Sequence, residues 1–336
     1  MRRDKVAARG QVHRLILESQ VLAGNLLGDD STRELHVYTP AGHDGRGLPL
    51  LVDLVGFTGS GLSHTNWRAF TENVPERLDR LIGTGAMGPV VVAFPDCYSR
   101  LGGNQYINSA AVGPYEDYLT REVVPFVERQ FGCGGEGRRA VFGKSSGGYG
   151  SIMHGLRRPD VWAAFACHSG DMAFEVCYLG DVPKVLNELA KHGRSIEAFL
   201  RHFEATPKST EAEGDVINLL AMAATYDPDP SSYLGVRLPV DLYTGELIPE
   251  RWNNWLAWDP ALLIERHADN LRRLNGIYID CGDHDQFALH FGSRRVHREL
   301  ERLGIAHTYE EFDDDHSAVD YRMDRSLPFL EKALRG

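Results

Sequence analysis

The stretch Gly143-Lys144-Ser145-Ser146-Gly147-Gly148 decides the fold, because it directly follows the apolar run 140–142 and precedes a helical pattern over residues 152–156. A Gly-x-Ser-x-Gly sequence between a strand and a helix predicts a sharp turn that lifts a serine hydroxyl above the sheet. Such a turn brings the residues two before and two after the serine together, so both must be small. Ser145 has Gly143 and Gly147 at these positions, whereas Ser146 has Lys144 on one side. We therefore expect Ser145 to be the nucleophile; for the motif alone, a glycine-rich turn without function is the alternative.

Short apolar runs that end in Gly, Asp or Ser recur along the chain, and helical patterns separate most of them. This alternation predicts an α/β fold with a mostly parallel sheet and helices on both faces. The first two runs lie too close together for a crossover helix, so we expect them to pair as an antiparallel edge. The eight expected strands cover residues 14–21, 34–38, 48–54, 90–94, 139–142, 163–167, 276–279 and 308–312.

Three amphipathic helices are expected between these strands. One covers residues 74–82 and ends at Gly83, and another has its apolar face marked by Val296 and Leu300. The third helix lies around residues 115–126, where Pro125 predicts a kink because proline has no N–H to donate.

More than a hundred residues separate the sixth expected strand from the seventh, which is far longer than an ordinary loop. We expect residues 1–170 and 260–336 to form one core domain and residues 171–259 to form an inserted helical cap or lid. Helical patterns occupy residues 185–191 and 196–203, and a polar acidic stretch covers 206–215. Trp255 is a candidate for an apolar wall of a substrate pocket, although such a residue more often packs a helix onto its domain.

A serine hydroxyl becomes a good nucleophile only when a base removes its proton and a third group orients that base. In this type of fold the partners follow the serine in the order acid, then histidine. His316 comes after the last expected strand and the turn 313–315, so it is the favoured base. His284, which follows the preceding strand, is the alternative.

The acid is expected at the end of the penultimate strand, where three carboxylates occur. Asp285 is favoured over Asp283, and Asp171 after the sixth strand is a third choice. The acidic loops could also combine Asp283, His284 and residues 313–315 into a metal site. Exposed carboxylates are usually hydrated, so we expect no metal ion.

Acyl transfer also requires two N–H donors that stabilise the developing oxyanion. The backbone N–H of Ser146 is one candidate, since it follows the nucleophile. Phe57 is the other, in the glycine-rich loop 55–61 after the third strand, where Gly56 lets the backbone approach a substrate. A flexible connection is the alternative reading of this loop.

The polar loop after the fourth strand should open on the same edge of the sheet as the nucleophile. Its candidates for substrate binding are Asn104, Tyr106 and Asn108. A polar surface turn without contact to substrate explains the same residues equally well.

The net charge of the chain makes some classes of binding partner unfavourable. The chain has 336 residues and a formal net charge of -11, which opposes binding to nucleic acid and offers no basic patch for a membrane surface. No apolar run approaches the roughly 18 residues of a membrane helix. Residues 1–5 are basic, but Arg9, His13 and Arg14 interrupt any apolar segment of a signal peptide. Five cysteines without a Cys-x-x-Cys pair indicate reduced packing residues, so we expect a cytoplasmic protein.

Taken together, the stretches 54–58, 143–148 and 282–287 resemble the putative esterase family of α/β-hydrolases, which includes esterase D, feruloyl and enterochelin esterases and the mycolyltransferases. The resemblance implies the α/β-hydrolase fold and a triad of Ser145, Asp285 and His316, with the family's acid falling on Asp285. It implies a serine carboxylesterase that hydrolyses small-molecule carboxylic or thioesters through an acyl-enzyme, without metal or organic cofactor, in a protein that pairs as a homodimer. The esterase D branch has histidine where this chain has Lys144.

Two other functions fit the same residues. The first is acyl transfer to an acceptor other than water, as in the mycolyltransferases, and a peptidase of the same fold is a related enzyme. The second is a binding module that retains the fold without activity. Reaction with a fluorophosphonate probe separates the binding module from the enzymes.

Overall fold

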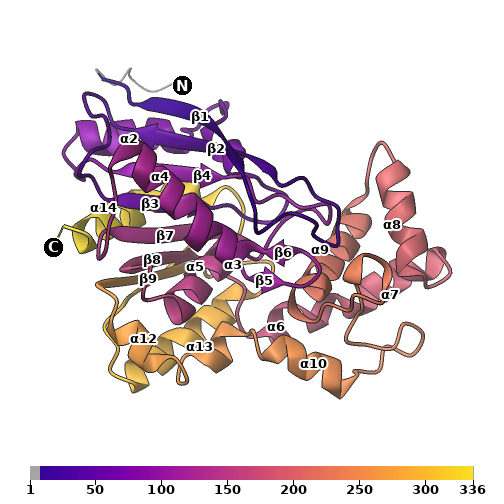
Figure 1. Ribbon diagram of the computed structural model, residues 1–336. Coiled ribbons are helices and arrows are strands. Elements are labelled where there is room, and N and C mark those ends of the chain that lie inside the picture. The colour runs from indigo at the N-terminus through magenta and orange to yellow at the C-terminus, as the bar shows by residue number, and fades with distance from the viewer. Residues whose placement is uncertain (1–7, 336) are drawn as a thin grey trace.

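The computed structural model describes residues 8–335, so the basic residues 1–5 lie outside the described part. All eight expected strands form a single sheet with the order β1-β2-β4-β3-β7-β8-β9-β10 (Figure 1). The strands are β1 (Gln11–Glu18), β2 (Thr32–Thr39), β3 (Leu50–Leu54), β4 (Val91–Pro95), β7 (Arg139–Lys144), β8 (Ala164–His168), β9 (Gly276–Gly282) and β10 (Thr308–Phe312).

The expected antiparallel edge is confirmed. β1 pairs antiparallel with β2, and β2 pairs antiparallel with β4, whereas all pairs from β4 to β10 are parallel. Because β3, β7, β9 and β10 run in the same direction, the loops that follow them meet at one edge of the sheet.

Helices cover both faces of the sheet, as expected. Alternate residues of β4 illustrate the two layers: Val91 and Ala93 belong to one hydrophobic core, and Val92 and Phe94 belong to the other. The helices α2 (Val74–Gly83) and α14 (Met323–Ala333) pack on the second core, and α4 (Val124–Phe131), α5 (Ser146–Arg157) and α13 (Leu289–Arg302) pack on the first. The architecture is that of the α/β-hydrolase fold.

The expected irregularity near Pro125 occurs one turn earlier than the proline itself. The segment is divided into α3 (Tyr115–Asp117), a π-helical turn η1 (Tyr118–Val123) and α4. Pro125 occupies the first turn of α4, where its missing N–H costs least. The π-helical turn accommodates the break in the hydrogen-bond pattern that the proline imposes.

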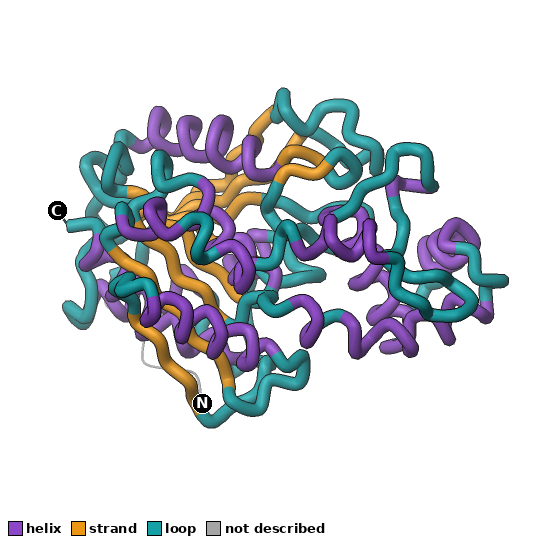
Figure 2. Tube along the Cα trace, turned by 90° about the horizontal axis from the view of Figure 1, so that it is seen from below, coloured by secondary structure: helices purple, strands orange, loops and turns teal. Residues whose placement is uncertain are grey.

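The insertion is built from helices and loops and extends from one side of the strands (Figures 1 and 2). The acidic stretch 206–215 is not a loop throughout, because α9 begins within it at Glu211. The hydroxyl of Thr210 and the carboxylate of Glu213 form a capping box there. The elements of this region are α6 (Phe174–Cys177), η2 (Leu179–Asp181), α7 (Val182–Lys191), α8 (Ile196–Ala205), α9 (Glu211–Tyr226), η3 (Tyr233–Gly235) and α10 (Pro249–Leu256).

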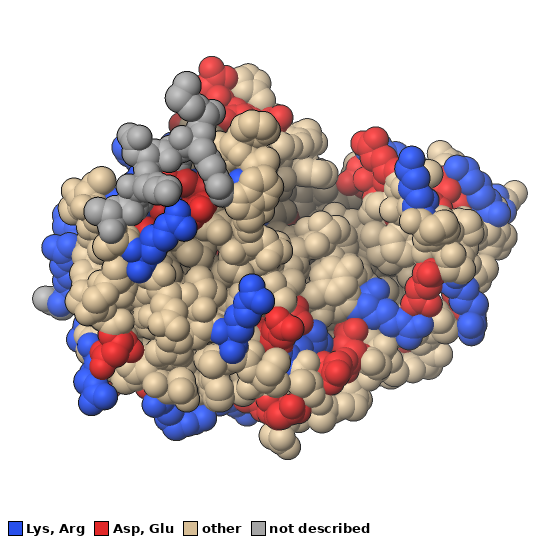
Figure 3. Space-filling model, turned by 90° about the horizontal axis from the view of Figure 1, so that it is seen from above, with Lys and Arg blue, Asp and Glu red and all other residues tan. Residues whose placement is uncertain are grey.

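Shorter elements complete the described chain: α1 (Gly61–Thr65), the hairpin β5 (Asn108–Ser109) and β6 (Gly113–Pro114), α11 (Pro260–Leu263), α12 (Ala268–Arg272) and η4 (Val319–Arg322). The five cysteines are all free and buried, as expected for packing residues. On the face shown in Figure 3, acidic and basic side chains are scattered among a larger area of uncharged residues. Within residues 8–335, no helix combines the length and the hydropathy that a membrane crossing requires.

Candidate active site

Ser145 lies on the turn between β7 and α5 with an unusual backbone conformation. Its φ of 58° and ψ of -123° place it in a region that side chains other than glycine rarely adopt. The turn is held because the Ser145 N–H donates to the His168 carbonyl at 2.9 Å and the Ser145 carbonyl accepts from the Tyr149 N–H at 2.8 Å. The serine side chain is half-buried and lines a cleft.

The two flanking glycines are required by contact with β3. A Cβ atom on Gly147 would lie 1.8 Å from the Leu54 carbonyl oxygen, and one on Gly143 would lie 2.2 Å from the same oxygen. A Cβ atom on Gly143 would also lie 2.6 Å from the Gly147 carbonyl oxygen. The close approach expected from the sequence therefore exists, and the neighbouring strand adds to it.

His316 and Asp285 lie on the loops after β10 and β9 and are hydrogen-bonded to each other. The distance from His316 Nδ1 to Asp285 Oδ2 is 2.7 Å, and both residues are more than 90% buried. The other carboxylate oxygen accepts from the Phe287 N–H at 2.9 Å, which fixes its orientation. This pair leaves His316 Nε2 available on the side of the cleft, because Nδ1 is held by the acid.

The loop after β3 lies against the serine turn. A Cβ atom on Gly56 would be 3.3 Å from both the Ser145 Cβ and the Lys144 carbonyl oxygen. In this loop the Thr58 N–H donates to the Gly102 carbonyl, while no described residue accepts from the N–H of Phe57. Ser146 is the first residue of α5, so its N–H has no acceptor within the helix.

Two connected hollows meet at Ser145. The larger, which we call the main cleft, has a volume of about 570 Å³ and contains Ser145, His316 and the loop 55–59. The smaller, which we call the inner pocket, has a volume of about 50 Å³ and extends from Ser145 beneath the insertion. Its lining combines the core domain and the insertion and comprises Phe57, Ser145, Ser146, Asp171, Cys177, Tyr178, Asp181, Asp215, Asn218, Leu219, Phe287 and Leu289.

The alternative base, His284, and the alternative acids, Asp283 and Asp171, are not part of the hydrogen-bonded pair at the main cleft. His284 is exposed and its Nδ1 contacts Asp283 at 2.8 Å and Asp313 at 3.4 Å, so it faces solvent rather than the serine. These three side chains are close enough to share a cation, but two of them are exposed. Asp171 lies in the inner pocket, where it accepts from the hydroxyl of Tyr178 at 2.9 Å.

The residues considered for substrate contact are mostly structural. Tyr106 has a positive φ of 62°, is buried, and donates its hydroxyl to the Val55 carbonyl at 2.6 Å. Asn104 accepts from the N–H of Tyr106, and Asn108 accepts from the N–H of Asp117. Trp255 is fully buried among aromatic rings of the insertion. None of these four residues lines the main cleft or the inner pocket.

Gln105 connects the serine turn to the inner pocket and was not singled out by sequence reasoning. Its amide nitrogen is 2.9 Å from Ser146 Oγ and 3.2 Å from Asp171 Oδ2. The polar loop was the correct signal, but Asn104 and Asn108 accept from backbone N–H groups, while Gln105 is the residue bonded to Ser146. The contributions of Asn218 and Leu219 from α9 depend on the folding of the insertion, which has no local sequence signal.

Charged groups surround the main cleft on the side of Lys144. Burial lowers the pKa of Lys144, with the carboxylates of Asp320 and Asp285 opposing that effect. Burial also disfavours the charged form of His64, but Asp53, 2.6 Å from its Nδ1, outweighs it and raises the pKa of His64. Arg68 forms an ion pair with Asp320 at the same end.

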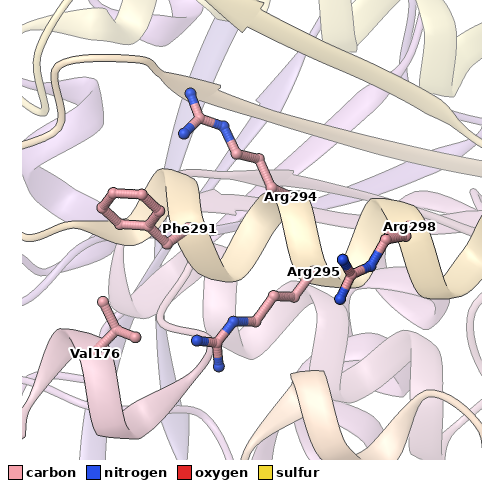
Figure 4. A pocket seen from close by; sticks show the side chains of 5 residues that line it. All are labelled: Val176, Phe291, Arg294, Arg295 and Arg298. Atoms are coloured by element: carbon pink, nitrogen blue, oxygen red, sulfur yellow. The ribbon is translucent and has the colours of Figure 1, made fainter.

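Another hollow, with a volume of about 530 Å³, lies on the surface between α6 and α13 (Figure 4). It is lined by Val176, Phe291, Arg294, Arg295 and Arg298. Arg294 is paired with Glu311 and Arg295 with Glu175, so two of its three guanidinium groups are already neutralised. Because it contains none of the residues around Ser145, it is not the candidate active site.

Comparison with known proteins gives one family match. The family model described as "Putative esterase" matches residues 30–324. Among curated proteins, no sequence is similar enough to count as a relative.

Solved structures with the same fold cover nearly the whole chain. A ferulic acid esterase is 18% identical with a TM-score of 0.63, covering 97% of this chain and 99% of its own. An S-formylglutathione hydrolase from Agrobacterium tumefaciens is 16% identical with a TM-score of 0.59, covering 98% of each chain. The fluorophosphonate-binding serine hydrolase F of Staphylococcus aureus is 16% identical with a TM-score of 0.59, covering 96% of this chain and 99% of its own. At these identities the likeness establishes the fold.

Proposed function

This chain belongs to the esterase family whose model it matches over residues 30–324, and from that premise we propose that it is a serine carboxylesterase using Ser145, His316 and Asp285. Family membership supports hydrolysis of carboxylic esters. The observation that carries the assignment of residues is the 2.7 Å hydrogen bond between His316 and Asp285 at the cleft that Ser145 lines.

In the first half of the reaction, the Ser145 hydroxyl attacks the ester carbonyl carbon while His316 Nε2 accepts its proton. Asp285 holds the Nδ1–H of His316 and stabilises the imidazolium that forms. The tetrahedral intermediate then collapses, the C–O bond to the alcohol breaks, and His316 returns the proton to the departing alcohol oxygen. Ser145 is left as an acyl ester.

Water completes the second half of the reaction. His316 removes a proton from the water molecule, which attacks the acyl carbonyl, and the proton then passes to Ser145 Oγ as the acid is released. Among the described residues, no hydrogen bond joins Ser145 to His316. Catalytic hydrogen bonds of this kind commonly tighten only when substrate is bound.

The N–H groups of Phe57 and Ser146 are the proposed donors to the oxyanion. Both belong to backbone segments in contact at the serine turn, and neither donates to a described residue. Removing one such donor typically costs about 10²- to 10³-fold in rate. Only a substitution to proline removes a backbone N–H, so Phe57→Pro is the direct test of the first donor.

A panel of nitrophenyl esters of increasing acyl length tests the proposed function. Wild type should hydrolyse them, and Ser145→Ala should lose at least about 10⁴-fold in kcat. Ser151→Ala is the matched control, because Ser151 lies on α5 and its hydroxyl is bonded to the Gly147 carbonyl rather than exposed in the cleft. Unchanged hydrolysis by Ser145→Ala would refute the assignment. Partitioning of the acyl group to an added alcohol would instead indicate acyl transfer.

We also propose a reducing, cytoplasmic location and a small-molecule substrate. The five buried free thiols are compatible with such a compartment. The net charge of -11 disfavours nucleic acid as a partner.

A further inference from the structure

Most charged side chains of the main cleft lie in close ion pairs, and one cation does not. Asp285 is bonded to His316, Asp53 to His64, and Asp320 to Arg68. Each of these three carboxylates therefore has a cationic or imidazole partner in direct contact, and Asp320 and Asp285 act on Lys144 only at longer range.

Lys144 is the cation that remains. It lines the main cleft, it is the residue before Ser145 in the chain, and no hydrogen bond or ion pair joins it to any described residue. Its stem is partly buried, so moving the ammonium group from water into the cleft is unfavourable by itself. A negatively charged group of a substrate would compensate for that cost.

The other side of Ser145 has the opposite charge. Three carboxylates, those of Asp171, Asp181 and Asp215, line the inner pocket, and no lysine or arginine of the described residues lines it. Asp181 forms an ion pair with Lys184 at 3.1 Å, outside this lining. An anionic group therefore finds no cationic partner among the described residues that line this pocket. An ester that carries an anion is therefore expected to place that group in the main cleft.

We propose that the substrate is an ester bearing a carboxylate or similar anionic group, and that Lys144 binds this group in the main cleft. The inference rests on the proposed ester hydrolysis and identifies the class of ester. Lys144 acts as a residue that determines specificity, and the chemical step remains with the groups described above.

Two pairs of esters test the proposal on the two sides of the scissile bond. On the acyl side, 4-nitrophenyl adipate is compared with 4-nitrophenyl methyl adipate, in which the carboxylate is capped. On the alcohol side, 4-acetoxybenzoate is compared with methyl 4-acetoxybenzoate. The variants are Lys144→Met, Lys144→Arg as the charge-conserving rescue, and Lys208→Met, which removes an exposed lysine outside the cleft.

Wild type and Lys208→Met should prefer the anionic ester of at least one pair by about tenfold in kcat/KM, the scale of one favourable charge contact. Lys144→Met should lose that preference while it still hydrolyses the capped ester, and Lys144→Arg should restore it. Equal kcat/KM values for both members of both pairs in wild type would overturn the proposal, as would a preference that Lys144→Met retains. If wild type hydrolyses none of the esters, the proposed function itself fails, which is a different outcome.

Discussion

At the scale of single residues, the site depends on groups whose positions are fixed by contacts far apart in the sequence. One carboxylate oxygen of Asp285 accepts a hydrogen bond from His316 Nδ1, and the other accepts from the N–H of Phe287. The first bond orients the imidazole, and the second orients the carboxylate. The positions of Ser145, Asp285 and His316 on the loops after β7, β9 and β10 could be predicted from the sequence, because each follows a recognisable strand. The contacts of Tyr106 and Gln105 could not, since they join residues distant in the sequence: Tyr106 bonds the Val55 carbonyl, and Gln105 bonds Ser146.

Asp285→Asn tests the orientation of the histidine. The amide retains the size of the carboxylate but cannot stabilise the imidazolium, so kcat should fall by about 10³- to 10⁴-fold. The thermal midpoint should change little. Asp283→Asn is the matched control, because Asp283 pairs with the exposed His284, and its activity should stay within about twofold of wild type. Equal activities of the two variants would contradict the assignment of Asp285.

Gly147→Ala tests the close approach of the serine turn to β3. The added methyl group would lie 1.8 Å from the Leu54 carbonyl oxygen, so the free energy of unfolding should fall by about 3 kcal/mol. Gly214→Ala is the control within α9, since nothing lies within 4 Å of its Cβ position, and it should stabilise the protein by about 0.5 kcal/mol. Urea denaturation of both variants measures the difference. A similar stability for the two proteins would show that the turn is not constrained as described.

At the scale of secondary structure, the sheet was predictable and the insertion was only partly so. The central strands β3, β4, β8 and β9 are short apolar runs whose residues are all buried. The edge strands β1 and β10 are mostly half-buried or exposed, and alternation of apolar and polar residues is their local signal. In contrast, the start of α9 at Glu211 lies within a polar stretch, and it depends on the Thr210 capping box rather than on apolar periodicity. The π-helical turn before Pro125 also lacks a sequence signal of its own.

Trp255→Ala tests the view that α10 is packed by an aromatic core. The Trp255 ring lies 5.4 Å from the Tyr226 ring and 5.7 Å from the Tyr178 ring, measured between centroids. Truncation should lower the free energy of unfolding by about 3–5 kcal/mol. The KM of the folded fraction for short nitrophenyl esters should be nearly unchanged, because Trp255 does not line the cleft. A raised KM with unchanged stability would instead support a role in substrate binding.

At the scale of the whole molecule, one buried histidine links stability to pH. His154 is fully buried, its Nδ1 accepts from the Trp162 indole N–H at 2.9 Å, and its Nε2 donates to the Tyr106 carbonyl at 2.9 Å. Burial lowers the pKa of His154 from 6.5 to about 4. The unfolded chain therefore binds a proton between these values when the folded protein does not.

Stability should consequently decrease as the pH falls from about 6.5 to about 4, by about 3 kcal/mol from this group. Replacing His154 with Gln should flatten that part of the profile, although the variant is less stable at neutral pH. His43→Gln, at an exposed position, should leave the slope unchanged. Denaturant midpoints at a series of pH values provide the measurement, and an unaltered slope in His154→Gln would refute the account.

The central claim is that Ser145 is the nucleophile of an ester hydrolase. The most direct measurement is fluorophosphonate labelling of the wild-type protein, followed by mass spectrometry of the intact chain and of its peptides. The account predicts a single adduct, located on Ser145, and none on folded Ser145→Ala. An adduct on another residue, or no adduct on the folded wild-type protein, would contradict it.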